Sequence, residues 1–272
     1  MTVFLIFLLG LAIGSFLNVL IDRLVKDESI AYPPSHCDHC KKPLQWYDLL
    51  PVVSFIVLNG KCRYCHKSIS WQYPIVELLT GILLMFVAFS HTSPLGSRFA
   101  TPQGWPNGFP WGGFLELLFT FFIISSLIVI FFTDLKYGII PDKVVFPAVA
   151  VTVFFLLITN YQLLITNYLP AGIGAFLFFL AIFLLSKGRG MGFGDVKLSF
   201  LLGLLAGFPG IVIVLYVAFL TGAVFSIILI LQGRKRLKET IAFGPFLVLA
   251  SLLFFFFADS ITFLWFLPGV LP

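Results

Sequence analysis

The chain has 272 residues, of which 60% are hydrophobic and only 11% are charged. Soluble globular domains are closer to half apolar and a quarter charged, so this composition excludes an ordinary soluble protein and predicts an integral membrane protein in a lipid bilayer. The formal net charge of +5 does not indicate nucleic-acid binding, because the basic residues are distributed as expected for a membrane topology.

Eight apolar segments predict an all-α polytopic membrane protein, since one helical crossing needs about 20 apolar residues. The first segment has no basic region before it and no small-residue cleavage site, so we expect a retained helix rather than a removed signal peptide. The sixth is short and joins the seventh through Phe208-Pro209-Gly210. In chain order the segments are residues 1–21, 74–90, 114–133, 144–160, 168–186, 196–207, 209–231 and 241–266.

This pattern divides the chain into a first transmembrane helix (1–21), a polar segment (22–73) and a seven-helix membrane domain (74–272). If the odd-numbered loops share one side of the membrane, that side carries sixteen of the seventeen lysines and arginines, and only Arg98 lies opposite. The positive-inside rule makes the basic side cytoplasmic. We therefore expect a multi-pass protein with the polar segment in the cytoplasm and both termini outside.

The polar segment holds all four cysteines of the chain, in the pairs "CDHC" and "CRYC". Two such pairs separated by 21 residues are typical of a four-cysteine zinc site, in which each pair presents two thiolates to one metal ion. A metal would help this small segment to fold, whereas disulfides would be reduced in the cytoplasm. We predict a structural Zn²⁺ with these ligands: Cys37, Cys40, Cys62 and Cys65.

Two other interpretations of the cysteines are open. "CRYCH" matches the motif for covalent c-type haem attachment, which is expected on the outer face, whereas the neighbouring basic residues predict the cytoplasmic side. A thioredoxin-like redox pair would need a βαβ pattern, and none is evident. One neighbouring histidine could replace a cysteine as ligand, although we expect all three to be solvated or outside the ligand shell: His36, His39 and His66.

Four acidic residues lie at the cytoplasmic ends of predicted spans: Asp22, Glu77, Asp134 and Asp195. An ionised acid inside a membrane is costly, so such residues indicate function unless they only end a helix at the headgroups. Asp134 ends the third span and Asp195 begins the sixth, which brings both to the same level. Two carboxylates that meet in a low-dielectric site share a proton. Such a pair can activate water, because one acid takes its proton while the other polarises a peptide carbonyl.

The segment "GMGFGDVKL" contains the GxGD motif of intramembrane aspartyl proteases, at Gly192-Phe193-Gly194-Asp195. It follows "GSFLNVLIDR", the paired CxxC motifs, "YPIVELLTG" and "TDLKYGIIPD", and it precedes "FGPFL" at 243–247. In these motifs and their order the chain resembles the bacterial prepilin peptidases, also called type IV leader peptidases. The resemblance covers nearly the whole chain.

The resemblance implies an enzyme of the bacterial inner membrane that cleaves the short basic leader of type IV prepilins and related pseudopilins at the cytoplasmic face. It further implies methylation of the new amino terminus with S-adenosylmethionine. By motif, Asp134 and Asp195 are the catalytic aspartates, and the four cysteines are the zinc ligands. The substrate must be locally extended before water can attack it, and we expect Gly192 and Gly194 to leave room for it.

We also expect the break at Gly244-Pro245 to help bind this strand, although a proline that starts a helix would give the same pattern. No glycine-rich nucleotide fingerprint occurs, so methyl transfer rests on the resemblance alone. The family often has a basic residue before "YP", whereas this chain has Gln72 there. Three polar residues contribute either to a second site or to packing between spans: Asn18, Asp22 and Glu77.

Two alternative functions follow from the same features. The first is a peptidase without methyltransferase activity. The second, from a different class, is an ion-coupled transporter that uses Asp134 and Asp195 as proton or cation ligands. Such a transporter is expected to contain inverted repeats with spans interrupted near the bilayer midplane, and no internal repeat is evident in the sequence.

Overall fold

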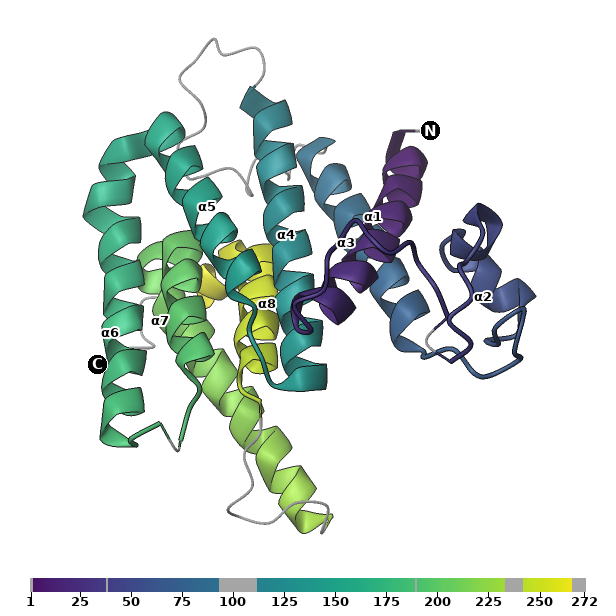
Figure 1. Ribbon diagram of the computed structural model, residues 1–272. Helices are drawn as coiled ribbons and strands as arrows, with labels where there is room; N and C mark the ends of the chain where they lie inside the picture. Colours follow the sequence, from purple (N-terminus) through teal and green to yellow (C-terminus); the bar gives the residue numbers. More distant parts are fainter. Residues whose placement is uncertain (1, 38, 93–111, 189, 233–241, 266–272) are drawn as a thin grey trace. The chain divides into compact units, whose positions relative to one another are not determined.

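The computed structural model describes residues 2–37, 39–92, 112–188, 190–232 and 242–265, which form helices and loops (Figure 1). Seven helices are long: α1 (Thr2–Leu24), α3 (Gln72–Thr92), α4 (Gly112–Tyr137), α5 (Asp142–Leu163), α6 (Leu169–Leu185), α7 (Phe193–Leu231) and α8 (Gly244–Trp265). The short elements are η1 (Trp46–Leu49), α2 (Val53–Val57) and the π-helical turn η2 (Leu164–Tyr168). No β-strand occurs within the described residues, so the predicted all-α class is confirmed.

Several of these helices are long and apolar enough to cross a membrane. By length and composition the segments that qualify are Val3–Leu24, Gln72–Phe89, Gly113–Tyr137, Asp142–Leu185 and Phe193–Leu231. Large apolar side chains lie on their outer surfaces; for example, Phe16 is 53% exposed, Phe86 46% and Phe154 65%. Apolar surface on this scale suits contact with lipid rather than water, as expected for a multi-pass membrane protein.

The chain divides into two compact units. Unit 1 comprises Met1–Ser97 and Gly113–Val129, and unit 2 comprises Arg98–Gly112 and Ile130–Pro272. The first part of α4 therefore belongs to unit 1 and its last part to unit 2.

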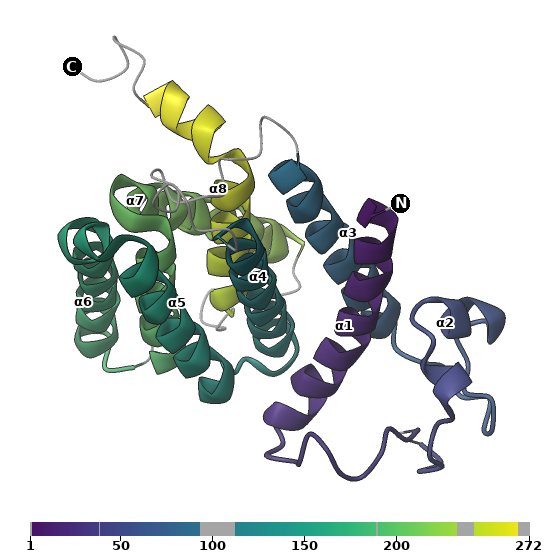
Figure 2. The same cartoon turned by 90° about the horizontal axis from the view of Figure 1, so that it is seen from above.

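In unit 1, α1 and α3 lie side by side and run antiparallel (Figures 1 and 2). Glycines line the contact: a Cβ at Gly10 would lie 2.7 Å from the Cα of Gly81, and a Cβ at Gly14 would lie 2.6 Å from the Cα of Glu77. Because these neighbours are backbone atoms, they could not give way to a side chain. The two helices can approach this closely only because the sequence places glycine at these positions.

In unit 2, α6 packs closely against α7, and α5 also contacts α7 (Figure 2). The contact again depends on glycine, because a Cβ at Gly203 would lie 2.5 Å from the Cα of Gly172. Farther along α6, the fully buried Phe179 stacks on Phe219 with 6.0 Å between the ring centroids. Small residues and aromatic rings together hold α6 against α7, the helix that carries Asp195.

Helix α7 is broken near its middle. Gly207 has a φ of +62°, which glycine adopts without strain, and Phe208 is also non-helical. The side chain of Asn167 bridges the break: its Nδ2 donates to the carbonyl of Phe208 at 3.0 Å, and its Oδ1 accepts from the amide of Phe208 at 2.5 Å. Backbone groups that leave a helix within a membrane need such partners, because lipid offers none.

The two halves of α7 run in opposite directions along α6. The first residue of α7 packs on Phe183 near the end of α6, and the first half then passes Gly172 near the start of α6. The second half returns, since Phe219 packs on Phe178 and Phe179. The break at Gly207 is therefore a reversal of the chain and not a gentle kink.

The predicted count of eight separate helices is not shown, although α7 itself consists of two helical halves joined at the break. Residues 196–207 and 209–231 belong to one helix, α7 (Phe193–Leu231), so the described residues contain seven long helices. The non-helical backbone covers only Gly207 and Phe208, and α7 extends on both sides of this point. A hydropathy pattern detects the proline and glycines at this point, but it does not show how short the interruption is.

The orientation of the helices across the membrane stays a prediction. It depends on where the lysines and arginines lie, and some of them are outside the described part of the chain: Arg98, Arg189, Arg234, Lys235, Arg236 and Lys238. The outer limits of the first and last predicted spans, at residues 1, 241 and 266, also lie outside it.

Candidate active site and metal centre

The two CxxC motifs of unit 1 form loops with the same local geometry. The amide of Lys41 donates to the carbonyl of Cys37 at 2.8 Å, and the amide of His66 donates to the carbonyl of Cys62 at 2.9 Å. Lys41 and His66 both have a φ of +57°, so each loop turns through the left-handed region at the same position after its first cysteine. An isolated β-bridge closes each loop, at His36–Pro43 and at Lys61–Ser68.

The two loops bring the four predicted ligands together. The sulfur atoms of Cys37, Cys40, Cys62 and Cys65 all lie within 4.8 Å of one another, and those of Cys37 and Cys65 are 3.8 Å apart. Zinc–sulfur bonds of about 2.3 Å in a tetrahedron place the sulfurs about 3.8 Å apart. The donor set therefore fits Zn²⁺, and the three neighbouring histidines do not belong to this group. One group of four thiols also argues against a separate CxxCH haem motif.

Two of these thiols differ in pKa. The pKa of Cys62 is lowered to about 7, chiefly because the backbone amide of Cys65 donates to its sulfur. The backbone amide of Lys67 acts to lower the pKa of Cys65, but loss of solvent and hydrogen bonds with the other three sulfurs outweigh it and raise that pKa to about 11. A metal cation would displace these protons, since only thiolates bind it.

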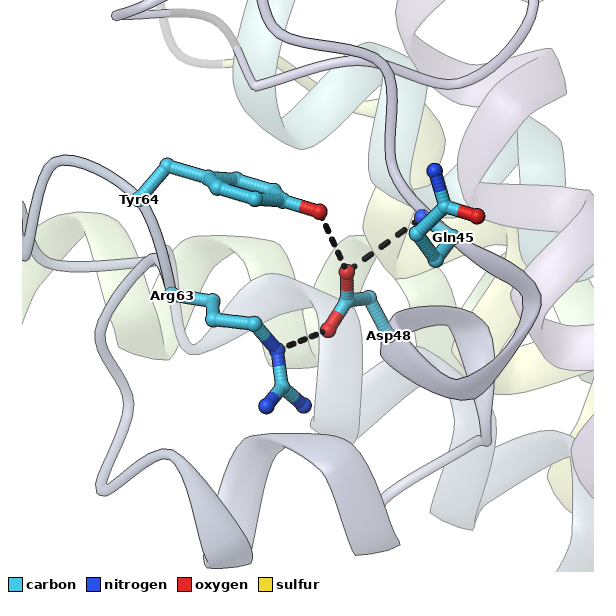
Figure 3. A network of polar contacts seen from close by, with 4 residues as sticks. All are labelled: Gln45, Asp48, Arg63 and Tyr64. Atoms are coloured by element: carbon cyan, nitrogen blue, oxygen red, sulfur yellow. Dashed lines mark hydrogen bonds and ion pairs between the residues drawn. The ribbon is translucent and has the colours of Figure 1, made fainter.

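A polar network joins the second cysteine loop to η1 (Figure 3). The carboxylate of Asp48 accepts a hydrogen bond from Nε of Arg63 at 2.7 Å, a longer one from the Tyr64 hydroxyl at 3.5 Å and one from the Gln45 amide at 3.3 Å. The guanidinium of Arg63 also lies over the ring of Tyr47, 4.9 Å from its centroid. The side chain of Asp48 is only 3% exposed, so the network fixes η1 beside the metal-binding loops.

The candidate catalytic aspartates belong to unit 2 and come from the facing ends of two helices. Asp134 lies one turn before the end of α4, and Asp195 lies in the first turn of α7, just after the N-cap residue Gly192. Both are buried, with exposed fractions of 5% and 7%. The charge of Asp134 acts on Asp195, so the structure brings together two acids that are 61 positions apart in the sequence.

Asp134 has the features of an acid kept available for a ligand. Its Oδ2 is buried and has no hydrogen-bond partner among the described residues. The backbone of Gly244 lies beside the carboxyl group, and a Cβ at Gly244 would fall 2.5 Å from this oxygen. Any side chain at position 244 would therefore push into the acid, so the space beside Asp134 depends on glycine.

The glycines predicted to bind substrate differ in their surroundings. A Cβ at Gly194 would lie 3.0 Å from the Cβ of Ile140, whereas a Cβ at Gly192 would meet nothing closer than Oδ2 of Asp195, at 3.8 Å. Pro245 lies in the first turn of α8, where proline is favoured in any helix. Whether these residues contact substrate stays a prediction.

Two contacts in this region were not expected from the sequence. Ile140, which is 7% exposed, would be met by a side chain at either Gly194 or Gly244, so it packs between the GxGD segment and the start of α8. Asp142, the first residue of α5, forms an ion pair with Lys197 of α7. The only sequence signal for these contacts is that "IIPD" and "GDVK" flank the two aspartates.

The other two acids at span ends belong to unit 1. Asp22 accepts a hydrogen bond from the hydroxyl of Tyr73 at 2.9 Å. Glu77 is 7% exposed, and its Oε2 accepts from the amide of Val52 at 2.8 Å. Both acids therefore line the contact between α1 and α3 and do not merely end a helix.

Comparison with known proteins agrees with these motifs. A family model described as "Bacterial Peptidase A24 N-terminal domain" matches residues 8–91, and one described as "Type IV leader peptidase family" matches residues 121–227. The chain is 32% identical to the "Prepilin leader peptidase/N-methyltransferase" of Aeromonas salmonicida (strain A449), over 98% of this chain and 94% of that protein.

Proteins of the same name from other bacteria are similarly related. The one from Neisseria gonorrhoeae is 31% identical over 93% of this chain and 90% of its own length. The one from Bacillus subtilis (strain 168) is 30% identical over 94% of each. No solved structure matches the chain. Together with the ordered motifs and the paired aspartates, these matches show that the chain belongs to the type IV leader peptidase family.

Proposed function

We propose that this protein is a prepilin leader peptidase of the bacterial inner membrane that also N-methylates the amino terminus it exposes. Its substrates are type IV prepilins or pseudopilins, cut at the cytoplasmic face. The observation that carries the proposal is the burial of Asp134 and Asp195 close enough for the charge of one to act on the other, in a chain 32% identical to a protein of that name.

In the proposed cleavage reaction the two aspartates share one proton. The ionised acid takes a proton from water, while the protonated acid donates a hydrogen bond to the carbonyl oxygen of the scissile peptide. The hydroxide adds to the carbonyl carbon, and the peptide nitrogen receives a proton as the carbon–nitrogen bond breaks. The unpartnered Oδ2 of Asp134 supports this scheme, because a free acid oxygen is what water or a substrate carbonyl requires.

The substrate must reach these acids as an extended strand, since the amides of a helix are bonded to each other. Gly244 keeps the space beside Asp134 open, and we propose that Gly192, Gly194 and the Gly244-Pro245 turn border the strand. A basic leader would remain on the cytoplasmic side by the positive-inside rule. The same rule places the lysine- and arginine-rich loops of the enzyme on that side. Both termini of the enzyme would then lie outside.

The four cysteines would hold a structural Zn²⁺ that stabilises the small segment between α1 and α3. S-adenosylmethionine would supply the methyl group for the second activity. The names of the relatives support both activities.

The test is a cleavage assay with purified protein in nanodiscs, a synthetic prepilin peptide and mass-spectrometric detection of the leader. Asp134→Asn and Asp195→Asn keep side-chain size but remove the acid. We expect each to reduce the cleavage rate by at least about 10³-fold, because an amide cannot exchange the proton. Glu116→Gln is the matched control, since Glu116 is also a buried acid, 8% exposed, but lies in unit 1.

The assay separates the alternatives. Cleavage at the wild-type rate by Asp195→Asn would contradict an aspartic mechanism. It would favour the alternative in which the two aspartates bind a proton or cation in an ion-coupled transporter. Cleavage by wild type without transfer of label from S-adenosylmethionine would leave a peptidase alone.

A further inference from the structure

Unit 1 contains a second group of buried polar residues, which the cleavage mechanism does not use. This polar seam consists of Asn18 and Asp22 on α1 together with Tyr73 and Glu77 on α3. Within each helix the two residues are one turn apart and therefore on the same face. The two faces meet, because Nδ2 of Asn18 donates to the carbonyl of Tyr73 at 3.1 Å and the Tyr73 hydroxyl donates to Asp22 at 2.9 Å.

Asn18 carries the observation that points to a ligand. It is 2% exposed, and its Oδ1 has no hydrogen-bond partner among the described residues. The amide cannot be turned around, because its nitrogen already donates to two carbonyls, those of Gly14 and Tyr73, and an oxygen there would be repelled. A buried acceptor without a donor is unfavourable, so this oxygen is suited to a group that brings a donor.

Glu77 adds a buried acid without a cation. Its neighbours are neutral donors, the amide of Val52 at 2.8 Å and the hydroxyl of Ser15. No lysine or arginine in the described part of the chain forms an ion pair with it. Arg23 is close in sequence, but its guanidinium nitrogens donate to loop carbonyls at residues 29, 30 and 33.

Burial changes along the seam. Asp22 and Tyr73 are partly exposed, whereas Asn18 and Glu77 are buried. The outer end therefore carries a partly exposed acid that is hydrogen-bonded to Tyr73, and the inner end carries a second acid and an amide oxygen without a partner among the described residues. Acidic and neutral oxygens on two contacting helix faces are complementary to a primary ammonium, which carries one positive charge and three donors.

We propose that the polar seam binds the free α-amino group of the cleaved prepilin, and that Glu77 is the base that deprotonates this amine for methyl transfer. The inference rests on the proposed function, because a free amino terminus is what leader cleavage creates and what an N-methyltransferase consumes. It places the methyl acceptor site in unit 1, whereas the aspartate pair lies in unit 2.

The chemistry balances with one co-substrate, S-adenosylmethionine. The ammonium first gives a proton to the carboxylate of Glu77 and becomes a neutral amine. Its nitrogen lone pair then forms a bond to the methyl carbon of the sulfonium as the carbon–sulfur bond breaks and its electron pair stays on sulfur. The product is a methylated ammonium and a neutral thioether, and Glu77 returns its proton to water when the product leaves. Asn18 holds the amine by its oxygen and does not exchange a proton.

The first experiment measures binding alone, so that it does not depend on either reaction. Purified protein is placed in nanodiscs of phosphatidylcholine and phosphatidylglycerol, which contain no primary amine. The probes are a synthetic peptide that begins at the residue after the cleaved bond and the same peptide with its amino terminus acetylated. We expect wild type to bind the free-amine peptide at least about tenfold more tightly, and Asn18→Leu to lose this preference.

The second experiment measures methyl transfer from labelled S-adenosylmethionine to the free-amine peptide. Glu77→Gln keeps an oxygen for the Val52 amide but cannot accept a proton, so a purely structural role would survive it. We expect its kcat to fall about 100-fold or more, with cleavage of a full prepilin peptide unchanged. Asn18→Leu should raise KM with a smaller effect on kcat. Glu116→Gln again serves as the matched buried acid and should behave as wild type.

The outcomes distinguish the seam from the proposed function. Equal binding of free and acetylated peptides by wild type would overturn the seam, whatever the methylation result. Methyl transfer at the wild-type rate by Glu77→Gln, or equal loss of cleavage and methylation, would also overturn it. If phosphatidylethanolamine in the nanodisc abolishes the preference for the free amine, the seam holds a lipid headgroup and the proposal fails. A wild type that binds the amine selectively but never methylates it would support the site and contradict the transferase activity.

Discussion

Units 1 and 2 both bury acids among apolar helices, but they accommodate them differently. In unit 1, Glu77 faces neutral donors supplied by its own neighbours, the Val52 amide and Ser15. In unit 2, Asp134 keeps an oxygen without a partner, and the backbone of Gly244 leaves space beside it. The first acid is held by two neutral donors, and the second keeps one oxygen without a hydrogen-bond partner among the described residues.

Glycine has an additional role in unit 2. Gly10 and Gly14 of unit 1 allow α1 and α3 to pack backbone against backbone. Gly244 of unit 2 faces a carboxyl oxygen, and Gly194 faces the side chain of Ile140. Glycine therefore supports helix contact in both units, at Gly10 and Gly14 in unit 1 and at Gly172 and Gly203 in unit 2, but among the described residues only in unit 2 does a glycine also face a carboxyl oxygen. This difference predicts that the two proposed activities can be lost separately.

The largest effect that separates the units is expected from Gly244→Ala. The new methyl group would lie 2.5 Å from Oδ2 of Asp134, so the acid must move. Displacement of a catalytic group by about 1 Å can cost about 100-fold in rate, and we expect cleavage to fall by that amount. Methylation of a pre-cut peptide should stay unchanged, which label transfer from S-adenosylmethionine would measure.

Gly174→Ala is the matched control for this substitution. Gly174 also lies in a unit 2 helix, and a Cβ there meets nothing within 4 Å. Normal cleavage by both variants would mean that the space beside Asp134 has no role in the reaction.

Metal removal should affect unit 1 and spare unit 2. We expect a chelator, or the double variant Cys37→Ser and Cys40→Ser, to make the segment between α1 and α3 sensitive to limited proteolysis, because metal binding supplies much of the folding energy of such small modules. Prepilin cleavage should fall less than methylation. His39→Ala is the control, since His39 is not part of the thiol group.

The metal site should also depend on pH in one direction. Zinc must displace a proton from Cys65, whose pKa is raised, and below about pH 7 also from Cys62, whose pKa is about 7. Apparent zinc affinity should therefore fall as the pH drops through 7, measured by competition with a chromophoric chelator. An affinity that rises on acidification would contradict ligation by these thiols.

The smallest expected effect concerns the break in α7. Asn167→Leu removes both hydrogen bonds to Phe208 and should lower the stability of unit 2 by about 1–3 kcal/mol, since two backbone groups lose their partners. Thermal unfolding in detergent would measure this, with Gln162→Leu, an exposed position in α5, as control. Equal midpoints of thermal unfolding for the two variants would show that the backbone groups of Phe208 find other hydrogen-bond partners.

Much of the candidate site was predictable because its signals are local. The spacing of two CxxC pairs predicts four metal ligands before their positions are known, and the structure brings all four sulfurs within 4.8 Å of one another. Asp134 and Asp195 were identified by their places at the ends of apolar segments. Ile140 was not, because its place in "IIPD" does not show that it packs against Gly194 and Gly244, which are distant in sequence.

The sequence by itself determined which segments are apolar helices, which thiols can bind a metal and which acids lie at the helix ends. These properties depend on hydropathy, residue type and short spacing, all of which act within a few residues along the chain. Only the tertiary structure decided that α7 reverses along α6, that Lys197 pairs with Asp142 and that Asn18 meets Tyr73. Those contacts depend on the distance and the register at which two helices pack. Glycines far apart in the sequence, such as Gly172 and Gly203, allow that close packing.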